Sequence, residues 1–205
     1  EGVQGWSFLD TETEKPLIVS LLDEENIIAR TVLRPSNVSG IFNLRNRHSG
    51  CIVKDDGSVF GWSDNNEMLP PPGLKDVRYV AAGGHAYVAL KNDDTVVAWG
   101  DSLRGGLIAP ETDKELRGVR KLAATDGAFV ALRNDGQLVA WGDPDYGGTI
   151  PTSVISQLSP VDKIIGNTAD FTALLRDGRV FSWGASWPDG FWVSDARDAI
   201  QLCAS

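Results

Sequence analysis

The residues of this sequence that could act as a general acid or base near neutral pH are its two histidines, His48 and His85. Histidine fills that role in many enzymes because its imidazole titrates close to neutrality. Each of the two falls where one apolar run turns into the next, and the positions equivalent to His85 in later parts of the chain hold Gly127 and Ala169. No Ser-His-Asp order, Walker loop or HExxH zinc motif occurs. We therefore interpret both histidines as turn residues and predict that the protein is not an enzyme.

Neighbouring carboxylates could bind calcium, as in Asp143-Pro144-Asp145 and Asp55-Asp56. A turn in which an aspartate accepts a hydrogen bond from a nearby backbone N–H explains each pair equally well without an ion. The glycine pairs 105–106 and 147–148 look superficially like phosphate-binding loops, but they recur in the chain and no helical pattern follows them. The sequence therefore predicts no metal and no cofactor, and it assigns these glycines a backbone role.

The strongest candidate for binding is a loop that holds three large aromatic side chains, Trp187, Phe191 and Trp192. Exposed aromatic rings act as hot spots in protein interfaces and as stacking platforms for sugars. The alternative is that these rings pack the end of the chain against its N-terminal segment. Both interpretations stay open on the sequence alone.

These candidates sit on a repeated pattern of roughly 40 residues. Its best copy, residues 128–151, has an apolar run, an Asn-Asp-Gly turn, a second apolar run ending in Trp141-Gly142, and an acidic loop closing on a glycine pair. Further copies cover residues 86–110, 170–184 and 49–63, and a degenerate copy covers residues 17–30. One column of the repeat holds a tryptophan in four copies and an arginine in the degenerate one: Arg30, Trp62, Trp99, Trp141 and Trp183. We expect these tryptophans to pack between structural units.

Each copy of the repeat predicts a β-hairpin, because Asp-Gly between two β-rich runs favours the positive φ values of a tight turn. The five hairpins are expected at residues 17–30, 49–62, 86–99, 128–141 and 170–183. Glu24-Glu25 replaces Asp-Gly in the first hairpin, which should be the least regular. An alternating run before four of the hairpins and one at the end of the chain predict further strands at 41–44, 77–80, 119–122, 161–164 and 200–203. A fourth, shorter strand is expected after the tryptophan, as at 105–108 and 147–150.

Four short strands per repeat are typical of a β-propeller blade, so the predicted fold is an all-β propeller with repeats over residues 17–205. Because one blade cannot bury both of its faces alone, neighbouring blades must stack around an axis. Two arrangements fit the five hairpins. In the first, the ring has five blades, and residues 200–205 complete the blade of the first hairpin and close it. In the second, the chain is a consecutive piece of a longer ring. Residues 1–16 form an N-terminal segment with one possible closing strand, at 3–9.

The charge of the chain restricts its partners. The formal net charge is −9 with an isoelectric point near 4.7, and no basic stripe is present, which argues against nucleic-acid binding. No run of 18 apolar residues occurs, so no transmembrane helix is predicted. Cys51 and Cys203 are interpreted as buried thiols, although a disulfide between them stays open. The first residue is Glu1 rather than methionine, which suggests a processed or trimmed N-terminus.

The repeats, with ALRNDGQLVAWGD at 131–143 as the best copy, resemble the RCC1-like repeat family, and within it the bacterial branch. The resemblance is strong over residues 40–184 and weak over 17–40. It implies a non-catalytic, disc-shaped scaffold whose loops bind another macromolecule, in a family that includes a nucleotide-exchange factor for a small GTPase and secreted bacterial inhibitors of β-lactamase. The chain has too few repeats for their seven blades and lacks a basic character. The resemblance therefore implies the fold and a role in binding macromolecules, but it identifies no individual functional residue.

The sequence thus favours a binding module that recognises a protein through the loops at one rim of the propeller. Trp187, Phe191 and Trp192 are the expected contact residues, together with Tyr146 and Arg104, which occupy equivalent loop positions in adjacent repeats. The alternative is a carbohydrate-binding, lectin-like propeller, and an enzyme is the third choice. The resemblance implies a secreted bacterial protein, and association between copies is expected if the ring is incomplete.

Overall fold

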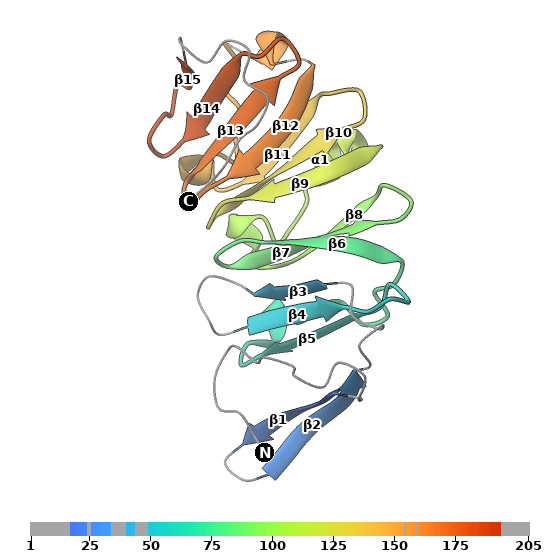
Figure 1. Ribbon diagram of the computed structural model, residues 1–205. Helices are drawn as coiled ribbons and strands as arrows, with labels where there is room; N and C mark the ends of the chain where they lie inside the picture. Colours follow the sequence, from blue (N-terminus) through green and yellow to red (C-terminus); the bar gives the residue numbers. More distant parts are fainter. Residues whose placement is uncertain are drawn as a thin grey trace.

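The protein is an all-β row of stacked antiparallel sheets, as the sequence predicts (Figure 1). The computed structural model describes residues 17–23, 26–33, 40–43, 49–153, 155–158 and 160–193. These residues form five sheets, in the order of the chain from one end of the row to the other.

The strands follow the repeat. The first hairpin consists of β1 (Leu17–Asp23) and β2 (Asn26–Leu33), and its pairing is irregular between Leu21 and Leu22. The next three sheets have three strands each: β3 (Gly40–Asn43), β4 (Ser49–Val53) and β5 (Val59–Ser63); β6 (Val77–Ala82), β7 (Ala86–Lys91) and β8 (Val96–Gly100); β9 (Val119–Ala124), β10 (Ala128–Arg133) and β11 (Leu138–Gly142). The last sheet has four: β12 (Val161–Gly166), β13 (Asp170–Leu175), β14 (Val180–Gly184) and β15 (Phe191–Val193).

Short helices occupy the connections between sheets. One α-helical turn, α1 (Pro110–Glu115), precedes β9. The described residues also contain four 3₁₀ turns, namely η2 (Asn66–Met68), η3 (Ser102–Arg104), η4 (Pro144–Tyr146) and η5 (Ile155–Gln157). Among the residues with a described position, no helix is long and apolar enough to cross a membrane.

The prediction of a fourth strand at 105–108 and 147–150 is wrong. The chain there forms a 3₁₀ turn that ends in a left-handed glycine, with φ of 90° at Gly105 and 86° at Gly147. The N–H of the second glycine of each pair then donates to the carbonyl of Asp101 or Asp143. This local ring turns the chain at the end of the sheet, and residues 105–108 and 147–150 form no strand beside β8 or β11.

The core lies between the sheets rather than within any one of them. In β10, Phe129 and Ala131 pack toward the β6–β8 sheet, while Val130 and Leu132 pack toward the β12–β15 sheet. Strand residues alternate between the two faces, and here both alternating sets are apolar and fully buried. A blade of this kind is stable only with a neighbour on each side.

The tryptophan column joins each sheet to the one before it, as predicted. Trp99, Trp141 and Trp183 are buried, and each indole N–H donates at 3.0 Å to a backbone carbonyl in the loop that follows the preceding sheet; the acceptors are Met68, Gly105 and Gly147. Each ring also lies against an aromatic side chain of its own sheet, namely Tyr87, Phe129 or Phe171. Trp62 is half-buried. The arginine at the equivalent place in the first hairpin, Arg30, is exposed.

A β-bulge in the first strand of a sheet provides a second connection. The register of β6 shifts at Arg78 and that of β9 at Arg120. A bulged residue is left out of the ladder, so its side chain can point away from the sheet. The guanidinium of Arg78 donates to the carbonyl of Val119 at 3.0 Å, and that of Arg120 donates to the carbonyls of Val161 and Asp162.

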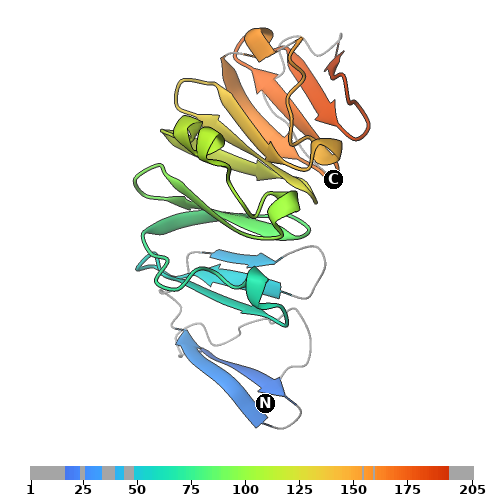
Figure 2. The same cartoon turned by 180° about the vertical axis from the view of Figure 1, so that it is seen from behind.

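The described sheets form an open row rather than a closed ring. The β1–β2 hairpin and the β12–β15 sheet lie at opposite ends in both views (Figures 1 and 2). The strands predicted at 3–9 and 200–205, which would take part in closure, lie outside the described residues.

Candidate binding rim

The loops that follow β8, β11 and β14 lie at the same edge of their sheets as the turns between the first two strands. The backbone shows this contact in each case: Asp101, Asp143 and Ala185 donate their N–H groups to the carbonyls of His85, Gly127 and Ala169. We call this surface the rim and define it by residues 83–85, 101–109, 125–127, 143–151, 167–169 and 185–190. The hairpin turns lie at the opposite edge.

The rim aspartates that could have bound a metal shape the loops instead. Asp101 accepts the N–H of Leu103 at 2.8 Å, and Asp143 accepts the N–H of Asp145 at 3.0 Å. At the other edge, Asp56 accepts both the N–H and the hydroxyl of Ser58. No group of three or more His, Cys, Asp or Glu side chains that could hold a metal ion occurs in the part of the chain that is described.

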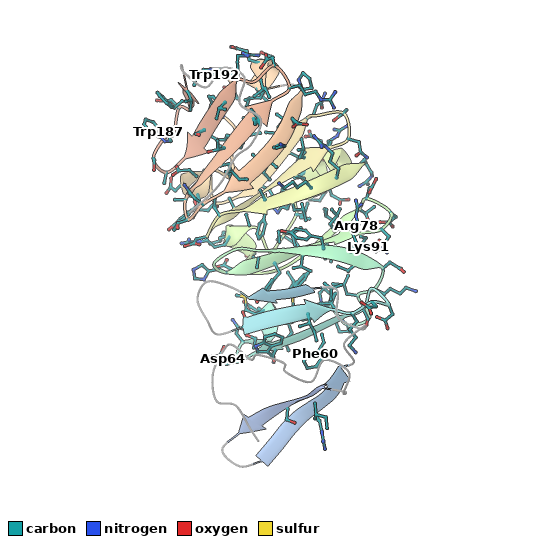
Figure 3. The ribbon with its side chains drawn as sticks, in the orientation of Figure 1. Phe60, Asp64, Arg78, Lys91, Trp187 and Trp192 are labelled. Carbon is teal, nitrogen blue, oxygen red and sulfur yellow. The ribbon has the colours of Figure 1, made fainter. Side chains whose placement is uncertain are left out.

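Two of the three predicted aromatic residues form an exposed pair. The rings of Trp187 and Phe191 stack with centroids 4.7 Å apart and planes inclined by 24°. Their exposed fractions are 44% and 43%. Figure 3 shows Trp187 and Trp192 at the same end of the molecule, on the β12–β15 sheet. The pair offers aromatic faces to solvent from a fixed position, because stacking and the short β15 strand orient the rings.

The third aromatic residue, Trp192, has a different environment. It alternates with Phe191 along β15, so the two rings lie on opposite faces of the sheet. Trp192 packs against Phe181 at 4.9 Å between centroids, and the guanidinium of Arg179 lies 4.8 Å from its ring. This half-buried ring therefore stabilises the end of the last sheet through contacts with that sheet itself. The N-terminal segment, against which the sequence alternative would pack it, lies outside the described residues.

Arg104 and Tyr146, which occupy equivalent positions in adjacent loops, lie together. The Arg104 guanidinium lies 4.7 Å from the Tyr146 ring centre, and its Nε lies 3.6 Å from the Asp143 carboxylate. A hydrogen bond with Tyr146 is the main factor that raises the pKa of Arg104. Tyr146 also packs on Gly127, where any side chain would collide with the ring. Both residues are half-buried, and they hold two neighbouring rim loops together.

Two exposed leucines on the rim were not singled out from the sequence. Leu103 is 79% exposed and Leu107 is 67% exposed. The equivalent positions of the next repeat hold Asp145 and Thr149. An apolar residue at a loop position where the neighbouring copy is polar is the signal that could have identified them.

The remaining sequence candidates show no catalytic arrangement. His85 is exposed, and its contribution to the rim is its carbonyl, which glycine and alanine provide in the next two sheets. Cys51 is a buried free thiol, and burial raises its pKa to about 12. His48 and Cys203 lie outside the described residues.

Comparison with known proteins identifies the fold through solved structures rather than through related sequences. No protein-family model and no curated protein sequence matches the chain. Among solved structures, yeast RCC1 (Prp20), crystallised with Kap60, is 17% identical with a TM-score of 0.56, over 78% of this chain and 47% of that one. The CRINKLY WD40 ectodomain of the Arabidopsis thaliana receptor kinase ACR4 is 18% identical with a TM-score of 0.55, over 80% and 55%. Human WBSCR16 is 17% identical with a TM-score of 0.53, over 79% and 52%.

These similarities show that the chain has an RCC1-like β-propeller repeat fold, which confirms the predicted fold class. The chain spans about half the length of the solved chains that it matches. At these identities the comparison concerns the fold alone.

Proposed function

We propose that the protein is a non-catalytic scaffold that captures a protein partner through its rim. The rigid part of the scaffold is the stack of sheets, in which each blade is fixed to its neighbours by buried apolar faces and by the tryptophan column. The binding part is the set of loops at one edge, whose side chains differ from one repeat to the next. Such differences suit a single asymmetric partner.

The observation that carries this proposal is the exposed stacked pair of Trp187 and Phe191. Within the stack, tryptophan and phenylalanine are buried, as at Trp183 and Phe171. Trp187 on the rim and Phe191 beside it remain about two-fifths exposed, although each ring stacks on the other and Phe191 is held by β15. Ordered, exposed aromatic rings lose little conformational entropy on binding, which is why they dominate protein interfaces.

The similar structures support a protein partner. The yeast RCC1 chain that resembles this one was crystallised with another protein, Kap60. The secreted bacterial setting suggested by the resemblance belongs to the same proposal.

A carbohydrate ligand is the second candidate, because a stacked aromatic pair also suits a sugar ring. A propeller lectin would repeat its site in several blades. The residues four positions after Trp99, Trp141 and Trp183 are Leu103, Asp145 and Trp187, so the aromatic platform is not repeated in these three blades. This difference favours one protein partner.

The test is capture of a partner from candidate extracts, followed by affinity measurements with purified proteins, beside binding to a glycan array. Replacing both Trp187 and Phe191 by alanine should weaken the protein complex by about 30-fold or more, the loss typical of hot-spot aromatics. Tyr79→Ala is the matched control, since it removes an exposed aromatic ring from β6, away from the rim.

Equal affinity of the double variant and the parent chain would remove the aromatic pair from the binding site. Sugar binding at several sites per chain, with no captured protein, would establish the lectin alternative instead.

A further inference from the structure

The partner segment that the rim accepts follows from the chemistry of the rim itself, on the premise that the proposed function is right. Exposed apolar residues occur in two of its loops, Leu103 and Leu107 in one, Trp187 and Phe191 in or beside the other. Between them lies the loop 143–151, which carries the exposed carboxylate of Asp145. The rim therefore has exposed apolar residues at both ends, with acidic residues between and beside them.

Charge is distributed unequally between the two edges of the same three sheets. The rim holds five carboxylates, Asp101, Asp126, Asp143, Asp145 and Asp189. Its cationic side chain is Arg104, which already lies against Asp143 and Tyr146, and His85 is the only other basic residue in these described loops. Asp145 and Asp189 are exposed, Asp101 and Asp143 are half-buried, and one carboxylate oxygen of Asp126 is buried. Arg104 pairs with Asp143, but one guanidinium does not balance five carboxylates, so the rim has a negative potential that water screens.

The opposite edge shows that this imbalance is specific to the rim. The hairpin turns 91–95, 133–137 and 175–179 contain four cationic and four acidic residues. They form the ion pairs Lys91–Asp93, Arg133–Asp135 and Arg179–Asp177. The acidic character of the whole chain is therefore not spread evenly over its surface.

We infer that the rim binds a basic protein segment with apolar side chains on both sides of its lysines or arginines. The apolar residues of the segment cover the Leu103–Leu107 and Trp187–Phe191 pairs, and its cationic residues face Asp145 and Asp189. The two apolar pairs belong to sheets that are two steps apart. With about 10 Å between stacked sheets, they are separated by roughly 20 Å, a span of about six extended residues. The charges accelerate and orient the encounter, and the apolar contacts slow dissociation.

The experiment is selection of a random peptide library on the purified full chain, followed by affinity measurements with the recovered peptides. Recovered sequences should combine lysine or arginine with flanking apolar residues. Their affinity should fall by about tenfold in the double variant Asp145→Lys/Asp189→Lys, and it should fall with added salt. Glu115→Lys on α1, on the other side of the row from β15 in Figure 1, is the matched charge reversal and should leave affinity unchanged.

Three outcomes overturn the inference: recovery of acidic or uncharged peptides, unchanged affinity in the Asp145→Lys/Asp189→Lys variant, or no recovered peptide at all. The variants Leu103→Ala and Trp187→Ala separate this failure from that of the proposed function. Loss of binding in these variants with indifference to the charge reversals would retain the rim as the binding site and reject the basic partner. Indifference to all of them would reject the rim itself.

Discussion

The last three sheets differ at their two edges. One edge is the rim, and the other, which we call the turn edge, is formed by the hairpin turns 91–95, 133–137 and 175–179. At the turn edge, the same contact recurs: Asp93, Asp135 and Asp177 each accept the N–H of the residue two positions later. At the rim, the backbone contacts recur but the side chains do not, as Leu103, Asp145 and Trp187 illustrate. A feature that every blade needs in order to fold is repeated. A feature that differs from blade to blade on a shared backbone is available for recognition.

The same contrast holds for one residue type. Trp141 is buried between sheets, with its N–H bonded to Gly105. Trp187 is 44% exposed and touches one neighbouring ring. We call the stacked sheets and their buried tryptophan column the frame. Position in the repeat, rather than residue type, therefore separates a tryptophan of the frame from a tryptophan of the binding surface.

The largest expected effect comes from removing a tryptophan of the frame. Trp141→Ala should lower the free energy of unfolding by about 3–5 kcal/mol, because it leaves a cavity between two sheets and an unpaired carbonyl at Gly105. Trp187→Ala should cost less than about 1 kcal/mol, since Trp187 is 44% exposed and its removal leaves no cavity between sheets. Chemical denaturation of both variants measures the difference. Equal losses would contradict the division into frame and rim.

Much of the frame is predictable from the sequence, because its causes are local and repeated. Asp-Gly turns determine the hairpins, and the tryptophan column marks the strand end that packs on the preceding sheet. The departure at Asp93-Asp94 is also interpretable. Asp94 takes the left-handed φ of 62° that glycine adopts in the other turns, a conformation that aspartate tolerates better than most residues do.

The rim is less predictable, because its side chains are decided by contacts between loops that are distant in the sequence. The sequence placed Arg104 and Tyr146 at equivalent positions but could not show that the two side chains engage each other. It grouped Trp192 with Phe191, although alternation along β15 places their rings on opposite faces of the sheet. It also predicted strands at 105–108 and 147–150, where left-handed glycines turn the chain instead.

The next largest loss of unfolding free energy is expected where a rim loop packs against the buried side chains of a sheet. Gly147 combines a φ of 86° with close packing, since a Cβ there would lie 2.7 Å from the Phe171 ring. Gly147→Ala should cost about 2–4 kcal/mol, the sum of backbone strain and a clash in the core. Gly73→Ala is the control, because φ is 77° and no atom lies within 4 Å of the added Cβ. It should cost about 1–2 kcal/mol. Similar values for both variants in thermal or chemical denaturation would mean that the loop yields to the added methyl group.

The smallest effect concerns the turn edge, where the repeated aspartate contact can be measured one residue at a time. Asp93 has a pKa of about 2, lowered chiefly by the hydroxyl and then by the N–H of Thr95. A carboxyl whose pKa is depressed on folding adds stability above its ordinary pKa, and this stability is lost as pH falls through about 2. Thr95→Val removes the hydroxyl and keeps the N–H, so the pKa should rise without reaching its ordinary value. An NMR titration of the Asp93 carboxyl measures the change. An unchanged pKa would show that the Thr95 hydroxyl contributes little and that the backbone N–H of Thr95 is the main cause of the lowered pKa.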